Sequence, residues 1–107
     1  MLKEVVDCLV NDGLPVTMVK THQGICYSAP LRYGNTIKFI PANDEQKADG
    51  VEFLLAAKGH HVFPYLVRQG DDLCDALAGW CEPAELKHTA WQNLMEEYRQ
   101  PPLNGPR

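Results

Sequence analysis

The sequence has no apolar run long enough to cross a membrane. A membrane-spanning helix needs about 20 predominantly apolar residues in succession, and charged residues interrupt every apolar run of this 107-residue chain well before that length. The first segment, MLKEVVDCLVND, carries charges at positions 3, 4, 7 and 12, so it lacks the uninterrupted apolar centre of a signal peptide. We therefore expect a soluble, cytoplasmic protein without a membrane partner.

Catalytic motifs are also missing. The chain contains no GxSxG elbow, HExxH, Walker loop, GxGxxG or CxxC pattern. Its paired carboxylates, Asp71–Asp72 and Glu96–Glu97, are sequence neighbours, and such neighbours do not face each other on a helix. We predict a protein that is not an enzyme and has no catalytic or cofactor-binding residues. A small enzyme built on a cysteine and a histidine stays an alternative.

The cysteines and histidines do not have the spacing of a metal site. Cys74 and Cys81 are separated by about 10.5 Å along a helix axis, whereas zinc ligands converge within roughly 2.3 Å of the ion. The adjacent His60 and His61 of GHHVFP diverge by about 100° on a helix, or point to opposite faces on a strand. We predict no metal, reduced cysteines and a histidine pair that serves a helix end.

Acidic residues are absent between Asp12 and Asp44, although the formal net charge of the chain is −4. This window holds four basic or titratable residues, Lys20, His22, Arg32 and Lys38. From Gln69 to the end, seven acidic residues stand against three basic ones. One part of the surface is therefore predicted to be basic and the rest acidic.

The spacing of apolar residues predicts an α+β fold that begins with an N-terminal helix. Residues 2–12 are amphipathic with a period of 3.6, and Gly13 is placed to end the helix. The next segment is rich in β-branched and aromatic residues and contains short turn signals. It predicts a three-stranded antiparallel meander at 15–21, 25–33 and 36–41, with turns at Gln23–Gly24 and Gly34–Asn35.

Three or four helices are predicted to follow the meander and to pack on one face. Asn43 and Gln46 form a capping-box pattern for a helix that extends to about Lys58. Residues 61–67 can continue this helix or form a short strand.

Two further helices are expected near the C-terminus. Asp71 or Asp72 caps a helix that contains Trp80, and Pro83 starts a helix that contains Leu94. Trp80 and Leu94 are expected to belong to one core formed by these two helices. We predict a single domain over residues 1–99 and a flexible, Pro-rich tail over residues 100–107.

Three segments follow one another in a familiar order: the helix that ends at Gly13, then LPVTMV with QGICYSAP, then VEFLLAAKGHHVFPYLV. Over residues 2–67 this order resembles the TubC-type docking domains found at the start of hybrid nonribosomal peptide and polyketide synthetase subunits. The resemblance implies a small, often dimeric, non-enzymatic module. It also implies that the hairpin and a nearby helix bind the charged tail of a partner, so a homodimer is one candidate assembly.

These observations lead to one functional hypothesis, a small non-catalytic docking, adaptor or inhibitor protein. It would bind a protein with an acidic surface or tail through a basic β-hairpin face. The candidate partner-binding residues are Lys20, His22, Arg32, Tyr33 and Lys38. A small acidic protein without motif chemistry is also typical of an inhibitor or adaptor that a phage or mobile element encodes.

A nucleic-acid-binding accessory protein is the alternative from another class. Tyr27, Tyr33 and Phe39 lie on the predicted strands, where exposed aromatic rings can stack on bases while basic residues contact phosphates. The isoelectric point near 5.4 favours a protein partner over this alternative.

Overall fold

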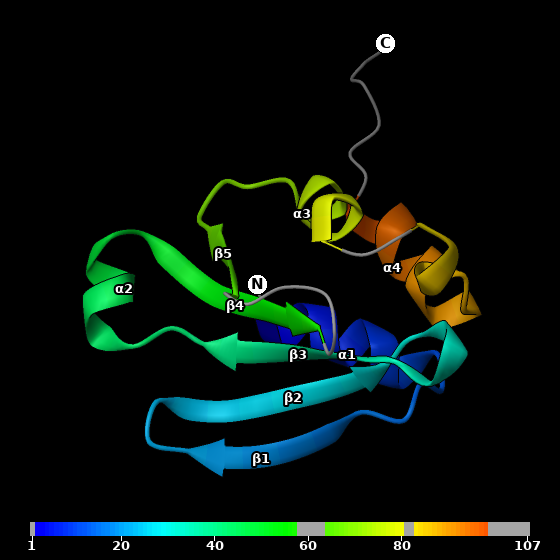
Figure 1. Ribbon diagram of the computed structural model, residues 1–107, viewed down its shortest axis with the longest axis horizontal. Coiled ribbons are helices and arrows are strands. Elements are labelled where there is room, and N and C mark those ends of the chain that lie inside the picture. Colours follow the sequence, from blue (N-terminus) through cyan, green and yellow to red (C-terminus); the bar gives the residue numbers. More distant parts are fainter. Residues whose placement is uncertain (1, 58–63, 81–82, 99–107) are drawn as a thin grey trace, which may run out of the picture.

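Within the residues that the structure describes, the chain forms a five-stranded antiparallel sheet (Figure 1). This computed structural model describes residues 2–57, 64–80 and 83–98. The helices are α1 (Leu2–Asn11), α2 (Asp44–Ala48), α3 (Leu73–Trp80) and α4 (Thr89–Tyr98), with two 3-10 turns, η1 (Arg32–Gly34) and η2 (Pro83–Leu86). The strands are β1 (Thr17–Thr21), β2 (Gly24–Pro30), β3 (Thr36–Pro41), β4 (Val51–Ala57) and β5 (Tyr65–Arg68). No helix in these three segments is long and apolar enough to span a membrane.

Helix α1 forms because an apolar stripe at helical spacing can face the core. Val5, Val6 and Leu9 are buried along this stripe. Gly13 then adopts a φ of +88°, a left-handed conformation that glycine reaches without a Cβ clash. Its amide donates to the Val10 carbonyl at 2.9 Å. The predicted N-terminal helix is confirmed, although it ends one residue earlier than expected.

The strands form a meander in the order β1-β2-β3-β4-β5, and every neighbouring pair is antiparallel. A two-residue turn joins β1 to β2, since Thr21 pairs with Gly24. The connection from β2 to β3 is different, because it passes through η1, where the Leu31 amide donates to the Asn35 carbonyl at 2.7 Å. The second reversal is therefore a 3-10 turn and not the predicted two-residue hairpin, and β2 ends earlier than predicted.

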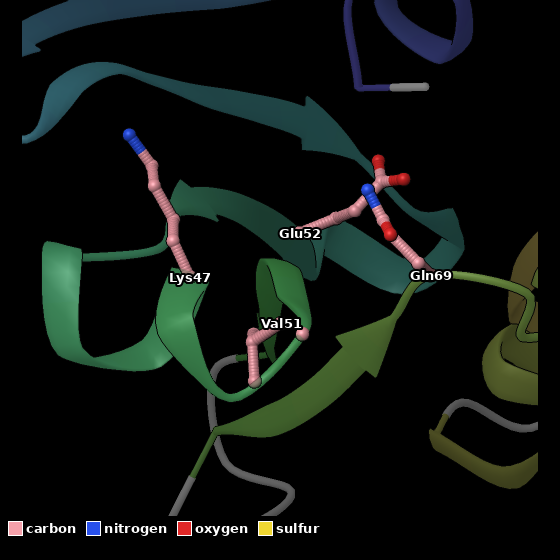
Figure 2. Close-up of a pocket in the computed structure, with 5 residues that line it drawn as sticks. Lys47, Val51, Glu52 and Gln69 are labelled. Atoms are coloured by element: carbon pink, nitrogen blue, oxygen red, sulfur yellow. The ribbon is translucent and has the colours of Figure 1, made fainter.

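The predicted three-stranded meander is wrong, because two further strands extend the sheet. The helix predicted from Asn43 to about Lys58 stops at Ala48, and β4 begins directly afterwards at Val51 (Figure 2). Its N-terminus was predicted correctly: the Gln46 amide donates to Asn43 Oδ1 at 2.8 Å, and the Asn43 amide donates to Gln46 Oε1 at 2.9 Å. Only the length of this helix was overestimated.

Strand β4 resembles a helix in sequence because it is apolar on both faces. Phe53 and Leu55 are buried against the helices, whereas Leu54 belongs to a second, smaller cluster on the other face of the sheet. A short strand buried on both faces loses its alternation, and periodicity then cannot distinguish it from a buried helix. Gly50, with a φ of +86°, lets the chain leave α2 and enter Val51.

Strand β5 lies in the segment where the sequence left helix and strand open. Tyr65–Arg68 pairs with β4, which decides this part in favour of the strand. Pro64 is described and is not part of the strand, whereas residues 61–63 of the predicted strand, the pair His60–His61 and the tail at 100–107 lie outside the described residues.

The helices near the C-terminus begin largely as predicted. Asp72 caps α3, because its Oδ1 accepts hydrogen bonds from the Cys74 and Asp75 amides at 2.8 and 3.2 Å. The helix predicted to start at Pro83 is divided in two, since Pro83 opens the short η2 and α4 begins only at Thr89.

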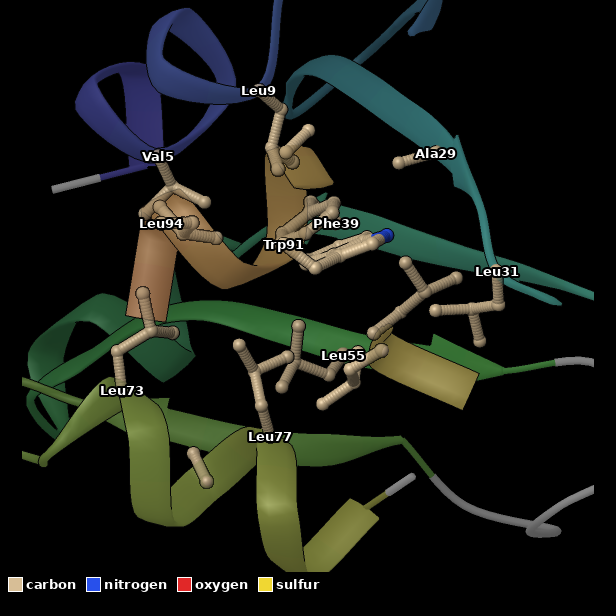
Figure 3. Close-up of a cluster of buried hydrophobic side chains, with 14 of the residues drawn as sticks. Val5, Leu9, Ala29, Leu31, Phe39, Leu55, Leu73, Leu77, Trp91 and Leu94 are labelled. Atoms are coloured by element: carbon tan, nitrogen blue, oxygen red, sulfur yellow. The ribbon is translucent and has the colours of Figure 1, made fainter. Parts of the chain in front are cut away.

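One apolar core joins the sheet to α1, α3 and α4 (Figure 3). Trp91 is fully buried in it and stacks on Phe39, with ring centroids 6.2 Å apart and an interplanar angle of 14°. The indole N–H donates to the Pro30 carbonyl at 3.0 Å. Leu94 is also fully buried, as predicted for this helix face. The Trp80 side chain, expected in the same core, lies outside the described part of the structure.

Candidate functional site

Lys20 and Lys38, two of the predicted partner-binding residues, lie on opposite faces of the sheet. Tyr27 pairs with both Met18 and Phe39, so these three residues share the face that the helices cover. Side chains alternate along a strand. Lys20 therefore lies on the helix side, like Met18, whereas Lys38 lies on the open side. Both are exposed, but one flat surface cannot include both.

Arg32 and Tyr33 lie in η1, at the end of β2 away from the β1–β2 turn (Figure 1). The seven residues of β2 separate these two ends by roughly 20 Å. Arg32 Nη2 donates to the Lys87 carbonyl, and Tyr33 is 75% exposed with a φ of +64°. His22 is exposed in the β1–β2 turn. The five predicted residues thus occupy three separate places.

The β1–β2 hairpin exposes apolar side chains among its basic ones. On the helix side, Met18 is 67% exposed, and Ile25, the cross-strand neighbour of Lys20, is 41% exposed. We call Met18, Lys20, His22 and Ile25 the hairpin face. Exposed apolar side chains that are contiguous and bordered by polar groups are typical of surfaces that bind other proteins. Of the predicted residues, the hairpin face includes Lys20 and His22.

Sequence reasoning missed Met18 and Ile25 because apolar residues on strands are usually buried. Only the position of β1 at the edge of the sheet, beyond the helices, leaves all five of its residues exposed. The same position exposes Val19, on the open side, by 61%. The edge position depends on strand order, and no local sequence signal predicts strand order.

The elements near the hairpin carry charges of both signs. Lys3 of α1 donates to the Asp7 carboxylate at 2.9 Å, and this hydrogen bond raises the pKa of Lys3 above its ordinary value. The pair is therefore neutral as a whole near neutral pH. Helix α2, at the same end of the sheet as the β1–β2 turn, carries Asp44 and Glu45 in its first turn and Lys47 in its last turn, so its net charge is negative. An acidic partner would thus be attracted to β1 and β2 and repelled by α2.

Two hollows lie on the surface of the described residues. The first has a volume of about 340 Å³, lies between α2 and the end of β5, and is lined by Lys47, Gly50, Val51, Glu52 and Gln69. In it, Lys47 points away from the other labelled side chains (Figure 2). The second, of about 460 Å³, lies where the residues after α1 meet the start of α4, and Asp12 and His88 are among its lining residues. A cofactor site is characterised by polar groups that converge on one point. We assign no cofactor to either hollow.

Metal-ligating side chains do not gather in the part of the chain that the structure describes. Across 2–57, 64–80 and 83–98, no three His, Cys, Asp or Glu side chains lie close enough to hold a metal ion. Cys8, Cys26 and Cys74 are thiols, and the Cys74 thiol donates to the Met95 carbonyl at 3.4 Å. The histidine pair and Cys81 lie outside the described residues, so the predictions made for them stay predictions.

The aromatic residues that suggested nucleic-acid binding do not form an exposed row. Phe39 is fully buried, and Tyr27 packs partly buried against the core. Tyr33 is exposed, but it lies in η1, away from the β1–β2 turn. A strand surface that stacks successive bases needs several exposed rings side by side, and Tyr27, Tyr33 and Phe39 do not form such a surface.

Comparison with known proteins finds no matching family model, no similar curated protein and no similar solved structure. The resemblance to TubC-type docking domains stays a prediction. Function must therefore be inferred from the surface chemistry of the hairpin.

Proposed function

We propose that this protein is a non-catalytic docking, adaptor or inhibitor protein that binds an acidic protein partner through the hairpin face. One observation carries the proposal: Met18 and Ile25 lie exposed beside Lys20 on a hairpin that extends past the helices. Burial of the apolar side chains would supply affinity, at about 25 cal/mol per Å² of apolar surface removed from water. Lys20 and His22 would favour a partner of the opposite charge.

The surroundings of the hairpin face support this choice. No acidic residue occurs between Asp12 and Asp44, so both strands of the hairpin are free of negative charge. The resemblance to TubC-type docking domains implies the same use of a hairpin. Arg32, Tyr33 and Lys38 are not part of the proposed surface, because they lie elsewhere on the molecule.

The test compares charge reversal on the two sides of the sheet. Wild type, Lys20→Glu and Lys38→Glu would be used to capture partners from host extract, and the captured proteins would be identified by mass spectrometry. Lys38→Glu is the matched control, because it makes the same charge change on an exposed residue of the open side. We expect at least one acidic protein to be retained by wild type and by Lys38→Glu but lost with Lys20→Glu.

Binding kinetics with the purified partner complete this experiment. Lys20→Glu should slow association and make it less sensitive to salt, since charges at an interface act mainly on the association rate. Met18→Ser should instead speed dissociation, because it removes apolar contact. Equal binding of wild type and both variants would exclude the hairpin face.

Titration with random oligonucleotides distinguishes the nucleic-acid alternative. Phosphate contacts impose a steep loss of affinity between about 50 and 200 mM salt whatever the sequence. Micromolar binding with that salt dependence would favour the alternative over a protein partner.

A further inference from the structure

Within the described residues, strand β1 forms an open edge of the sheet. It is the first strand there, β2 is its one partner strand among these residues, and it is exposed at all five positions. The Thr21–Gly24 pair closes a two-residue turn, and a turn of this length is normally closed by a hydrogen bond between the residues that flank it. Because hydrogen-bonded positions alternate in an antiparallel ladder, Thr17, Val19 and Thr21 face β2, and the backbone groups of Met18 and Lys20 face outward.

The sequence of β1, Thr17–Thr21 or TMVKT, is nearly the same when it is read backwards, apart from the exchange of Met and Lys. We propose that β1 pairs antiparallel with β1 of a second copy of this chain, about a two-fold axis at Val19. In this register Met18 lies opposite Lys20 of the second copy, and Thr17 lies opposite Thr21. The two sheets then form one continuous sheet of ten strands, which is twice the five strands of one copy. This proposal does not rest on the docking function.

The outward backbone groups fit this register. Met18 and Lys20 are the residues whose N–H and C=O groups face the open edge, and the axis at Val19 places these two residues opposite each other. They can exchange about four backbone hydrogen bonds across the interface, two on each side of the axis. Val19 then occupies a non-hydrogen-bonded position, where opposing Cα atoms are about 4.5 Å apart. Each outward donor and acceptor of the strand centre therefore acquires a partner.

The side chains also suit the register with the axis at Val19. On the open side, Thr17, Val19 and Thr21 would face their counterparts as neutral β-branched pairs, which favour strand pairing. On the helix side, each Lys20 would lie with its aliphatic stem along a Met18 side chain. No two charges of the same sign lie directly opposite each other, which would be destabilising.

Lys20 selects one register among the alternatives. With the axis at Lys20, two ammonium groups would lie directly opposite each other, at a cost in stability. With the axis at Met18, Lys20 would face Val16, which lies outside the strand. The axis at Val19 is the one that pairs all five residues without charge opposition. Lysine on an edge strand normally discourages association; here its position restricts association to a single register.

The helices leave space for the second copy. Met18 is 67% exposed on the helix side, so no described helix covers β1. A two-fold axis perpendicular to the sheet keeps the helices of both copies on the same side, and it brings two hairpin faces next to each other. The strands left at the outer edges of the dimer are the two β5 strands of four residues each, which provide little edge for further growth. Closed dimers are therefore expected rather than filaments.

The first test is the oligomeric state of the purified full chain, without any partner. An interface of two short strands is small, so we expect a weak dimer, with a Kd on the order of 10 to 100 µM. Sedimentation velocity over a concentration series should show the dimer. Raised salt should favour it, because the two Lys20 charges lie on a diagonal of about 7–8 Å. A chain that stays monomeric up to about 1 mM would overturn the proposal.

The second test is specific for the register. Val19→Cys would be made in a Cys26→Ser background, because Cys26 is the cross-strand neighbour of Val19 and would otherwise compete for the new thiol. Opposing Cα atoms about 4.5 Å apart lie within the range that a disulfide requires. Mild oxidation should therefore link two copies through Cys at position 19. The matched control, Lys38→Cys in the same background, should not be linked, since β3 is an inner strand.

Val19→Glu is expected to weaken the dimer instead of linking it. It would place two carboxylates opposite each other on the axis and weaken the dimer at least about tenfold, while circular dichroism and the melting temperature stay near those of wild type. Equal dimerisation of Val19→Glu and wild type, or equal cross-linking of Val19→Cys and Lys38→Cys, would refute pairing through β1. Failure of partner binding with an intact dimer would instead count against the docking function alone.

Discussion

At the scale of single residues, Trp91 combines an aromatic contact with a side-chain hydrogen bond in the core. Its ring stacks on Phe39, which in turn contacts Phe53 with centroids 6.1 Å apart, and its indole N–H donates to the Pro30 carbonyl. An apolar ring and a polar N–H are both needed at this position, which explains why tryptophan suits it better than phenylalanine.

Replacement of Trp91 should separate these two contributions. Trp91→Phe keeps a stacking ring but leaves the Pro30 carbonyl without its donor, so we expect a loss of about 1–3 kcal/mol in the free energy of unfolding. Trp91→Ala also creates a cavity and should cost about 3–5 kcal/mol. Urea melts followed by circular dichroism measure both values. Asn93→Ala, at an exposed position of the same helix, is the control and should change stability by less than about 0.5 kcal/mol.

Tyr33, unlike Trp91, is exposed and has an uncommon backbone conformation. Its φ of +64° is uncommon for a residue other than glycine, and its ring is 75% exposed, so its own burial does not offset the conformational cost. Leu31 and Asn35 define the turn around it through their backbone hydrogen bond. The sequence marked Tyr33 as a binding residue; the structure places it far from the hairpin face.

At the scale of elements, α2 is a short helix that is stabilised by the residues at its two ends. It spans five residues, too few for a helix to be stable by itself. A reciprocal pair of hydrogen bonds between Asn43 and Gln46 satisfies its first turn, and Gly50 provides the left-handed residue that follows it.

The capping box makes a testable contribution to stability. Asn43→Ala removes the side chain that accepts from the Gln46 amide, and it should lower the free energy of unfolding by about 0.5–2 kcal/mol. Asn43→Ser, which can still cap the helix, should retain most of the stability. Thermal melts of the two variants measure this difference. If both variants melted alike, the capping interaction would contribute nothing measurable.

At the scale of the whole molecule, elements far apart in sequence share one core. Leu9 from α1, Leu77 from α3 and Leu94 from α4 are all fully buried in the cluster that covers the sheet. Because no helix buries its apolar face without the others, the described elements should unfold together.

Cooperativity can be measured with one substitution in each helix. Leu9→Ala, Leu77→Ala and Leu94→Ala should each lower stability by about 2–5 kcal/mol. Each should shift a single urea transition that circular dichroism and tryptophan fluorescence report at the same midpoint. Leu66→Ala, at a position 38% exposed, should have a clearly smaller effect. Separate midpoints for the two probes would show that α1 or the C-terminal helices unfold independently.

Much of the local structure is specified by residues close together in the sequence. The stripe at Val5 and Leu9 predicts α1, the Asn43–Gln46 pair predicts the start of α2, and the Asp71–Asp72 pair predicts the start of α3. These predictions succeed because a helix face, a cap and a tight turn depend on contacts within about four residues.

Tertiary structure alone decided the strand at 51–57 and the arrangement of the exposed side chains. The run at 51–57 has no clear period, and it became a strand because partner strands lie on both sides and apolar clusters on both faces. The separation of Lys20 from Lys38 follows from the register of β1 and β3 on β2, which pairs residues distant in sequence. The exposure of Met18 follows from strand order, because the helices cover the inner strands and β1 lies at the edge. Composition could therefore locate a basic segment, but only the pairing of distant strands could determine which of its side chains lie together and which meet solvent.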